Sequence, residues 1–413
     1  MRYDVIVVGA GPAGSTTARE CASHGLSVLM LDKAEFPRDK PCGGGVTIRA
    51  ADLLPFDLTS VTERTAKGLH FSFRQGRGFN RASNDDLIFL TQRLKLDQLL
   101  VEKAVESGAS LRERCFIRTV ERHSTRVVVR ANGCAFEGSV LVGADGANGV
   151  TARLSGLKVR LAQGIAMEGN ITPRGRFPSE WENVVGLDIG CTPGGYGWLF
   201  PKSDHINIGM GAWKYFGPSL KESLGHLVRY YGFEAADIWG LRGHHMPVRL
   251  PGSALMDGNI LLVGDAAGLL DPFTGEGIHS AIWSGQAAAR AISAYIASKS
   301  DNLEEYRTDV EEGLGLDLKV SRQYQDLFHL TPRFYMWVAK NTSVLWGLTC
   351  RLMRGDQTYC GVMKNHRKLE TAVELISDLV RVTPFLQRRS GMKEPGPPQR
   401  FFLSGAHHRQ RRQ

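Results

Sequence analysis

The hydrophobic positions at the start of the chain predict a strand, a helix and a second strand in immediate succession. Residues 3–8 form an apolar, β-branched run, residues 12–24 have a helical pattern, and residues 27–31 form another apolar run that ends at Asp32. Continuous apolar runs of this length are typical of strands buried on both faces, as in a parallel sheet covered by helices. Two further runs of this kind are residues 140–143 and 259–263.

Residues 68–90 and 155–255 follow a different pattern. Apolar and polar side chains alternate there in several short stretches, which is typical of an antiparallel sheet with one buried face. We expect this sheet to be inserted between parts of the first unit, with a ligand cavity at their boundary. The alternating stretches are residues 69–73, 165–171, 185–189 and 205–210.

From about residue 300 to residue 386 the pattern is helical. Residues 334–338 and 344–346, followed by Leu352, Met353 and Arg354, bring aromatic and basic side chains together. One interpretation is a helix that packs on the alternating sheet. The other is an interfacial helix that rests on a membrane surface, and we keep both open.

The composition is that of an ordinary globular protein. Of its 413 residues, 42% are hydrophobic and 23% are charged, which excludes disordered and collagen-like chains. No apolar run reaches the length of a membrane span, and the first residues lack the features of a secretion signal. We therefore expect a cytoplasmic protein, with peripheral binding to the cytoplasmic face of the membrane as the alternative. Seven irregularly spaced cysteines without a C-x-x-C pair indicate neither a disulfide framework nor a zinc site, so we assign no metal.

Most of the net charge of +9 lies at the C-terminus. Residues 387–413 contain six Arg and one Lys against one Glu, together with several Pro and Gly, and we predict a basic, disordered tail. Its simplest interpretation is a solubilising end, and an anionic membrane surface is the second. We expect no nucleic-acid partner, because no aromatic-rich basic fold accompanies the tail.

The first strand–helix–strand unit carries a glycine fingerprint for a dinucleotide. Gly9, Gly11 and Gly14 have the spacing G-x-G-x-x-G between the strand and the helix, and Asp32 ends the second strand. The glycines allow a tight turn and a close approach to a pyrophosphate, while the carboxylate of Asp32 is placed to bind a ribose diol. The residues that we assign to this part of the cofactor site are Gly9, Gly11, Ala13, Gly14, Asp32 and Lys33.

The Asp-Gly turn at Asp145 and the Gly-Asp pair at Gly264 and Asp265 follow two further apolar strands. In this order and at these separations, the three segments resemble FAD-dependent oxidoreductases of the aromatic-hydroxylase, or glutathione-reductase-like, superfamily. The resemblance implies FAD as the cofactor, with Asp265 on its ribityl chain and Arg93 near its phosphates or ribityl chain. No second glycine fingerprint follows a strand, so we expect the electron donor to be either NAD(P)H that docks transiently or reduced ferredoxin.

Two motifs narrow the resemblance. Residues 193–201 match the pattern P-x-x-Y-x-W-x-F-P, and residues 41–45 resemble a P-C-G-G loop, as found in the geranylgeranyl reductase family. Residues 269–281 fit as well through their P-x-x-G-E-G-I core, and the resemblance extends over about residues 1–300. It implies backbone contact with the flavin at Cys42, Gly43, Gly44, Gly275, Gly277 and Ile278.

The same resemblance implies a reductase that saturates isolated double bonds of an isoprenoid chain. Tyr196, Trp198 and Phe200 alternate along one strand face and suit an aromatic wall for such a substrate, although a plain core face would give the same pattern. We assign catalytic roles to Cys42, Tyr196, Trp198 and Glu276, with Cys42, Glu276 or Asp271 as the proton source. Candidate substrates are geranylgeranyl diphosphate, a geranylgeranylated lipid or chlorophyll, and a menaquinone side chain. The alternative activity is an FAD-dependent monooxygenase acting on a hydrophobic substrate.

The expected fold is α/β, with a Rossmann-like FAD-binding domain, an inserted antiparallel substrate sheet and a helical C-terminal region. We assign residues 1–67, 91–154 and 256–300 to the FAD-binding domain and residues 68–90 and 155–255 to the substrate domain. Residues 301–386 form the helical region, and residues 387–413 form the tail.

Overall fold

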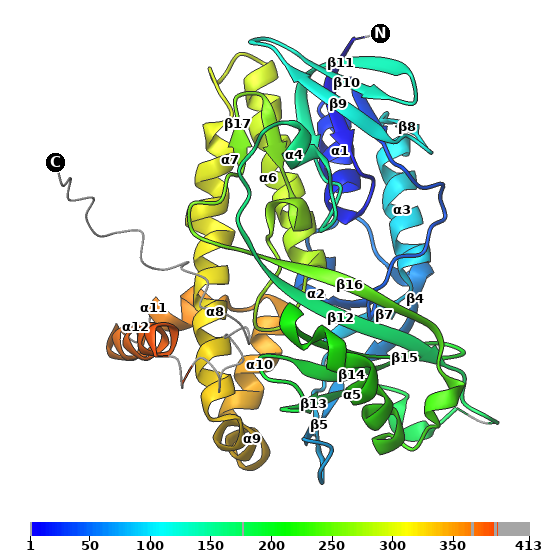
Figure 1. The fold of residues 1–413 in the computed structure, drawn as a ribbon, viewed down its shortest axis with the longest axis vertical. Helices are drawn as coiled ribbons and strands as arrows, with labels where there is room; N and C mark the ends of the chain where they lie inside the picture. Colours follow the sequence, from blue (N-terminus) through cyan, green and yellow to red (C-terminus); the bar gives the residue numbers. More distant parts are fainter. Residues whose placement is uncertain (1, 176, 365–366, 384–385, 387–413) are drawn as a thin grey trace, which may run out of the picture.

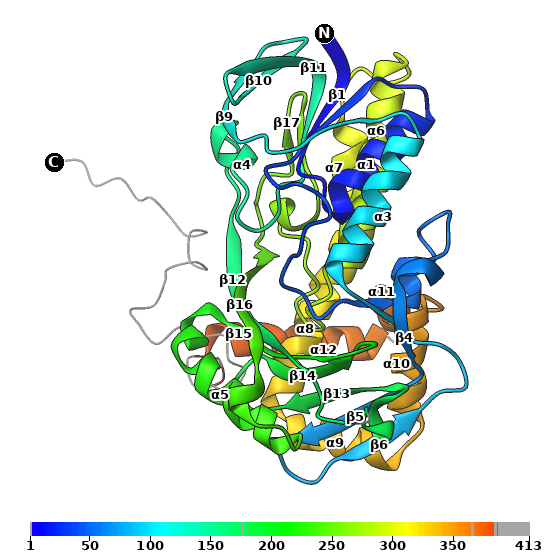
Figure 2. The same ribbon diagram turned by 90° about the vertical axis from the view of Figure 1, so that its right-hand side faces the viewer.

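The computed structural model describes residues 2–175, 177–364, 367–383 and 386, and two large sheets dominate it (Figures 1 and 2). The first sheet has a parallel centre in the order β18-β11-β1-β2-β8. Strands β17, β10 and β9 extend it by antiparallel pairing. Its strands are β1 (Arg2–Val8), β2 (Val28–Leu31), β8 (Ser110–Arg112), β9 (Ile117–Arg122), β10 (Val127–Ala131), β11 (Cys134–Gly143), β17 (Met256–Asp257) and β18 (Ile260–Leu262).

The apolar runs of the sequence form the centre of this sheet, as predicted. All four residues of β2 and all three of β18 are buried. Helix α1 packs against both α3 and α6, so the strands are shielded from water, which explains their lack of alternation. The helices of this unit are α1 (Pro12–Ser23), α2 (Ile48–Ala51), α3 (Arg93–Glu106), α4 (Thr151–Leu154) and α6 (Ile278–Ile296).

The second sheet has seven strands in the order β16-β12-β15-β14-β13-β5-β6. It is antiparallel except for the pair β5 and β13, which run parallel. A parallel pair needs a long connection, and the chain between these two strands supplies it. Helix α5 (Gly217–Tyr230) covers one face with Leu220, Leu224 and Leu227. The strands are β5 (Gly68–Phe73), β6 (Phe79–Ala82), β12 (Leu161–Ile171), β13 (Val184–Ile189), β14 (Tyr196–Pro201), β15 (Ile206–Trp213) and β16 (Trp239–Arg249).

A small third sheet lies at the boundary between the two units. It pairs β3 (Gly45–Thr47) and β4 (Thr62–Ala66) with β7 (Ile88–Thr91). Strand β7 comes from the range that we assigned mainly to the substrate unit, while β3 and β4 come from the cofactor unit. The glycine loop at residues 42–45 leads directly into β3, so this sheet positions it.

The C-terminal part is helical, as its pattern predicts. In Figure 1, α8 runs along the side of the molecule, α9 and α10 lie near the second sheet, and α11 and α12 pack against α8. Among the described residues, no helix has the length and apolar character needed to cross a bilayer. The predicted tail at 387–413 lies outside the described residues. The helices are α7 (Glu304–Asp309), a π-helical turn (Val310–Leu314), α8 (Gly315–Leu330), α9 (Pro332–Asn341), α10 (Val344–Arg354), α11 (Tyr359–Lys364) and α12 (Arg367–Val382).

Candidate functional site

A cavity of about 1230 Å³ is lined by residues of both large sheets. On the first sheet it meets Val8, Leu31, Ala144 and Val263, which lie at the carboxyl ends of β1, β2, β11 and β18. Ligands of open α/β sheets bind outside this edge. The volume exceeds the range of about 300–1,000 Å³ that is common for single-ligand pockets, so the cavity has room for a cofactor and a second ligand.

The glycine turn between β1 and α1 is built as the fingerprint predicts. Gly9 has a φ of +97°, and a Cβ on it would lie 2.4 Å from the carbonyl oxygen of Ala144. A Cβ on Gly14 would lie 1.8 Å from the carbonyl oxygen of Gly9, so neither position accepts a side chain. The Oδ2 atom of Asp32 accepts a hydrogen bond of 2.7 Å from the backbone N–H of Ala10 and thereby ties the turn to the end of β2.

Nearly all of the predicted cofactor residues meet at the cavity wall. Gly14 and Gly264 are the exceptions: Gly14 lies behind the turn against Gly9, and the Gly264 N–H donates to Ser284 Oγ at 3.0 Å. Both therefore shape the backbone instead of lining the cavity. The predicted residues that line it are Gly9, Gly11, Ala13, Asp32, Lys33, Cys42, Gly43, Gly44, Arg93, Asp145, Asp265, Gly275, Gly277 and Ile278.

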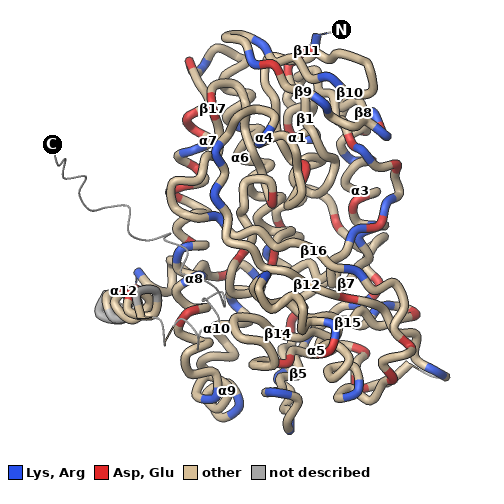
Figure 3. Tube along the Cα trace, in the orientation of Figure 1, with Lys and Arg blue, Asp and Glu red and all other residues tan. Residues whose placement is uncertain are grey.

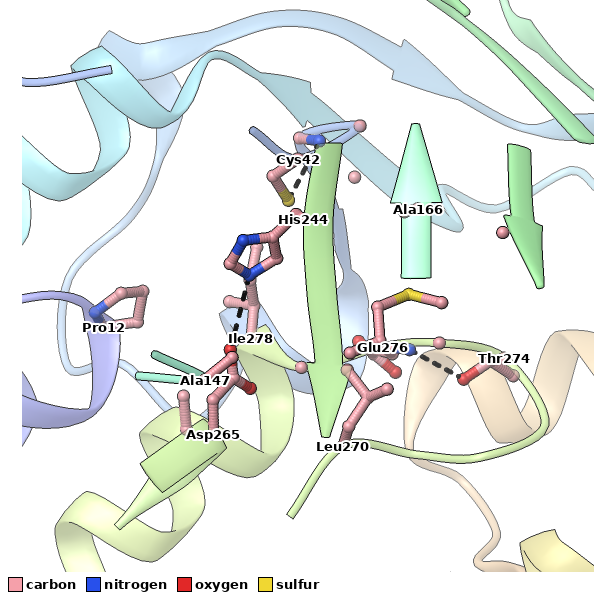
Figure 4. A pocket seen from close by; sticks show the side chains of 18 of the residues that line it. Pro12, Cys42, Ala147, Ala166, His244, Asp265, Leu270, Thr274, Glu276 and Ile278 are labelled. Atoms are coloured by element: carbon pink, nitrogen blue, oxygen red, sulfur yellow. Dashed lines mark hydrogen bonds and ion pairs between the residues drawn. The ribbon is translucent and has the colours of Figure 1, made fainter. Parts of the chain in front are cut away.

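Asp265 is held as a carboxylate by two basic side chains. Its Oδ2 atom lies 3.5 Å from Lys40 Nζ. The same atom lies 3.9 Å from His244 Nε2, and Figure 4 shows this contact. Burial alone would raise the pKa of Asp265, but Lys40 and His244 lower it to about 2. The sequence analysis missed both partners, although the inward position of His244 on β16 is the kind of placement that strand alternation can reveal.

Arg93 lies in the cavity wall and forms an ion pair with the carboxylate of Asp97. Its Nε and Nη2 atoms each donate a 2.7 Å hydrogen bond to Asp97, and Arg38 contacts the same carboxylate at 2.9 Å. Burial alone would lower the pKa of Arg93, but Asp97 and then Cys42 raise it, so the guanidinium stays charged beside the thiol of Cys42.

The two carboxylate oxygens of Asp145 differ in their hydrogen bonds. Its Oδ2 atom accepts hydrogen bonds from the N–H groups of Val150 and Thr151 and from Thr151 Oγ1, at 2.7 to 2.8 Å. Its Oδ1 atom is buried and has no hydrogen-bond partner among the described residues. A buried, unpartnered carboxylate oxygen in a cavity wall is a group that a bound hydroxyl would satisfy.

The glycine loop lies directly on the aromatic side chains of β14. A Cβ on Gly43 would lie 2.9 Å from Phe200 Cδ2 and 3.2 Å from Trp198 Nε1, so the backbone touches both rings. The N–H of Cys42 donates to Glu168 Oε1 at 2.7 Å, and the Gly44 N–H donates to Cys42 Sγ at 3.4 Å. Cys42 is thus fixed between the cofactor unit and the aromatic wall.

A buried lysine that the sequence analysis missed fastens this loop. The Lys202 Nζ atom donates to the carbonyl oxygens of Gly43 at 2.8 Å, Gly44 at 3.3 Å and Thr91 at 2.8 Å. The side chain is 2% exposed, and burial lowers the pKa of Lys202 to about 8. Lys202 directly follows β14, so it joins the second sheet to the glycine loop and to β7 of the third.

Glu276 is paired with a second missed residue, Arg49. The two Oε atoms of Glu276 accept hydrogen bonds from Thr47 Oγ1 and from the Arg49 guanidinium, which also lies 3.6 Å from Asp271. Burial alone would raise the pKa of Glu276, but Arg49 and then His279 lower it. This environment keeps Glu276 ionised and does not suit the proton-donor role that the sequence suggested.

The aromatic side chains of β14 belong to a wider apolar platform. Apolar residues on the neighbouring strands continue the surface across the sheet. For example, Trp198 of β14 pairs with Leu187 of β13, which pairs with Phe71 of β5. Trp198 Nε1 donates to Asn207 Oδ1 at 2.8 Å, and the hydroxyl of Tyr196 donates to the carbonyl of Thr274, so both rings are fixed. The platform consists of Tyr196, Trp198, Phe200, Val185, Leu187, Ile189, Leu69 and Phe71, all of which line the cavity.

Comparisons with known proteins assign the family. Residues 2–205 match the model of an FAD binding domain. The chain is 32% identical to the geranylgeranyl diphosphate reductase of Rhodobacter capsulatus over 348 residues, which cover 80% of this chain and 85% of that protein. The chain belongs to the geranylgeranyl reductase family of FAD-dependent oxidoreductases. It is also 31% identical to the menaquinone reductase of Mycolicibacterium smegmatis over 386 residues, which cover 85% and 91% of the two chains.

A solved structure agrees with this family assignment. The crystal structure of a geranylgeranyl bacteriochlorophyll reductase-like protein from Thermoplasma acidophilum matches with a TM-score of 0.69 at 26% identity, over 78% of this chain and 87% of that chain. FAD is accordingly the cofactor of this family member. The cavity fits FAD, because the N-terminus of α1, where a pyrophosphate would bind, is open beside Gly11. A Cβ built on Gly11 would meet only one atom within 4 Å, Arg38 Nη2 at 3.4 Å.

We predict that Lys202→Met weakens FAD binding by about tenfold or more. The variant removes one hydrogen-bond donor from each of three buried carbonyls, and a buried polar group that loses its partner costs roughly 1–3 kcal/mol. In the unsubstituted protein, FAD affinity should also fall as the pH rises through about 8, since a neutral amine has one N–H fewer. FAD titration by fluorescence at several pH values measures both effects. Lys214→Met, at an exposed position, is the control, and a pH step that persists in Lys202→Met would contradict the assignment.

We predict that Arg49→Met destabilises the protein by about 3–5 kcal/mol, because it leaves Glu276 and Asp271 without their cation. The pKa of Glu276 is lower in the folded protein than its value of about 4.3 in an unfolded chain. Its ionised form therefore stabilises the fold above about pH 4.3, and this stabilisation is lost as the pH falls through the pKa of the folded protein. The difference between variant and parent in denaturant midpoint should therefore shrink below about pH 4.3. The double variant Arg49→Met/Glu276→Gln should recover part of the loss. Equal midpoints at pH 7 would show that the ion pair is not structural.

Proposed function

We propose that the protein is an FAD-dependent reductase that saturates isolated double bonds in an isoprenoid chain of the geranylgeranyl type. The observation that carries this proposal is the continuity of the cavity, in which the cofactor residues and the apolar platform share one space. The relatives named for geranylgeranyl diphosphate and geranylgeranyl bacteriochlorophyll reduction support a substrate of this class.

The platform has the extent that a long, flexible hydrocarbon needs. Neighbouring strands lie about 4.8 Å apart, so the two steps from Trp198 through Leu187 to Phe71 extend the apolar surface by roughly 10 Å. Side chains of α9 and α10, including Met336, Leu345 and Leu348, line the cavity as well. An isoprenoid chain lying on this surface would keep water away from the reacting bond.

Reduction of an isolated double bond needs a hydride at one carbon and a proton at the other, because no carbonyl is present to accept the negative charge. Bound FAD in its reduced form supplies the hydride. The ring faces of Trp198 and Tyr196 would stabilise positive charge on the substrate, in an environment where water competes little. Asn207 and Thr274 hold these rings in place through the hydrogen bonds described above.

We assign the proton to the thiol of Cys42. Glu276 is held as an anion by Arg49, and the hydroxyl proton of Tyr196 is donated to Thr274, so neither side chain offers a proton to the substrate. The Cys42 thiolate that remains after transfer would be stabilised by Arg93 and Lys202, with which it interacts electrostatically. A proton from water restores the thiol once the product has left.

The head group of the substrate and the electron donor also belong to the proposal. Geranylgeranyl diphosphate, a geranylgeranylated lipid or chlorophyll, and a menaquinone side chain each carry the required hydrocarbon. The relative named menaquinone reductase supports the last of these. NAD(P)H and reduced ferredoxin are the two donors that we propose.

The test of the function is anaerobic. The FAD-loaded protein is reduced with dithionite and mixed with geranylgeranyl diphosphate, and flavin absorbance and product mass are followed. We expect the flavin to reoxidise and each reduced bond to gain two hydrogen atoms. A flavin that stays reduced with this substrate, and with a geranylgeranylated lipid and a menaquinone, would overturn the proposal. A product that carries a new oxygen atom after air is admitted would establish a monooxygenase instead.

We predict that Cys42→Ala slows alkene reduction by roughly 10²–10⁴-fold, the usual contribution of a general acid, while FAD remains bound. Single-turnover kinetics with the reduced, substrate-mixed protein measure the step directly. Cys134→Ala, at an exposed position on β11, is the matched control and should reduce the substrate at the parental rate. A Cys42→Ala variant with an unchanged single-turnover rate would remove Cys42 from the proton-donor role.

We predict that Leu187→Trp shortens the hydrocarbon that the platform accepts, because an indole on β13 would fill the space beside Trp198. The ratio of kcat/KM for geranylgeranyl diphosphate to that for geranyl diphosphate should fall by about tenfold or more. Leu241→Trp places the same side chain at an exposed position outside the cavity and should leave the ratio unchanged. An unchanged ratio in Leu187→Trp would show that the chain does not lie on this row.

A further inference from the structure

Helices α9 and α10 and the β5–β6 hairpin together present an exposed surface that is both apolar and basic. We propose that this surface docks on an anionic lipid bilayer. We call it the docking face and define it by three apolar and four basic residues. These are Phe334, Trp337 and Val344, and Arg74, Arg77, Arg333 and Lys340.

The apolar residues of the docking face are unusually exposed for their size. Phe334 is 59% exposed, Trp337 is 61% exposed and Val344 is 78% exposed. Scattered single apolar residues on a surface need no explanation, but here two aromatic residues and a valine fall within eleven consecutive positions. Aromatic side chains of this kind are favoured at the interface between lipid and water.

The opposite sides of the same helices line the cavity. Tyr335, Met336 and Ala339 of α9 and Leu345 and Leu348 of α10 are cavity-lining residues. Helix α9 therefore carries apolar side chains toward both the cavity and the solvent. A helix with two apolar sides is normally covered on both of them.

The charge of this region is of one sign. Residues 331–354 contain four basic side chains and no Asp or Glu, and residues 68–84 contain three basic side chains and again no acidic one. Arg74, Arg77, Arg333 and Lys340 are all exposed. Figure 3 shows basic positions, in blue, on α9 and near β5. Such a surface complements the negative potential of a bilayer that contains anionic lipid.

The hairpin and the helix are held together as one surface. The guanidinium carbons of Arg74 and Arg333 lie 5.3 Å and 5.7 Å from the centre of the Phe73 ring. Arg81 donates from Nε to the carbonyl of Ala339 at 2.7 Å and from Nη2 to that of Thr342 at 2.9 Å. These contacts position basic side chains of both elements beside the exposed aromatic residues.

A bilayer fits this surface better than a protein partner does. Basic residues beside exposed aromatic ones, with no acidic residue between them, are the signature of binding in the plane of an anionic membrane. Protein interfaces, in contrast, enrich aromatic residues and arginine in a desolvated core surrounded by a mixed polar rim. No acidic residue lies within residues 68–84 or 331–354, and the next ones along the chain, Asp85 and Asp356, both pair with Arg354 at the end of α10.

Docking would place the helical wall of the cavity against the lipid. The chain of a membrane-embedded substrate would then have a short path between α9 and α10 to the apolar platform. This consequence rests on the proposed function, whereas binding to the bilayer does not.

The first test measures binding alone. The full-length, FAD-loaded protein is floated with vesicles of phosphatidylcholine, with and without phosphatidylglycerol. We expect binding to the anionic vesicles and about a tenfold loss of affinity in Trp337→Ser. Trp239→Ser, which removes a 50% exposed tryptophan from β16, is the matched control and should bind like the parent. No binding to anionic vesicles, or equal binding by Trp337→Ser and the parent, would overturn the proposal.

The second test separates the docking face from the basic segment at 387–413, because both could attract an anionic vesicle. Hydrogen exchange of the full chain is compared with and without vesicles. We expect vesicles to slow exchange at residues 331–345, and slowing confined to residues 387–413 would overturn the proposal.

A third measurement keeps docking distinct from turnover. Trp337→Ser should reduce micellar geranylgeranyl diphosphate at the parental rate but reduce a vesicle-embedded isoprenoid several-fold more slowly. Vesicle binding by a protein that reduces neither substrate would uphold the docking face and remove the proposed function. Equal rates on both substrates would overturn the role of the docking face in substrate access.

Discussion

The ammonium of Lys202 is the contact on which the arrangement of the site depends. It follows the end of β14, is buried, and donates to carbonyls of the glycine loop and of Thr91. A buried cation is costly unless its donors are satisfied, so the loop and the end of β7 must stay within reach of Nζ. The placement of Cys42 and Gly43 against the aromatic side chains of β14 follows from this requirement. One side chain thus couples the substrate sheet to the cofactor unit.

The cavity is divided between charged and apolar walls, and the glycine loop lies where they meet. On the cofactor side, Asp265 is paired with Lys40 and Glu276 with Arg49, and these cations lower the pKa of both carboxyl groups. On the substrate side, the platform offers only hydrocarbon and aromatic rings. An anion held beside a cation is a poor proton donor, and for this reason we propose the thiol of Cys42, which lies where the two walls meet, for that role.

Local patterns in the sequence predict most of the fold. The apolar runs and the glycine fingerprint give the strands and the turn of the first sheet, because each is decided by neighbouring residues. The alternation of Tyr196, Trp198 and Phe200 predicts a shared face, and the structure places that face on the cavity, where the sequence had left a plain core face open.

The partners of the site residues could not be predicted in the same way. Lys202 reaches Gly43 across 159 positions, and Arg49 reaches Glu276 across 227. Nothing local to these residues indicates the pairing, which depends on how the three sheets come together. Glu276 therefore looked available as a proton donor as long as its cation was unknown. The same reasoning explains why Lys40 and His244 were not assigned to Asp265.

Helix α9 connects the interior of the molecule with its surface. Soluble helices usually separate an apolar side from a polar one, and burial of the apolar side stabilises them. In α9, Met336 faces the cavity while Phe334 and Trp337 are exposed, so a single covering surface does not account for both sides. The cavity wall must be apolar to accept a hydrocarbon, and exposed aromatic residues are favoured only where water is displaced from them. A helix between an isoprenoid-binding cavity and a bilayer, as we propose for α9, would satisfy both conditions. A helix that only covered the cavity would have no need for an exposed Trp337.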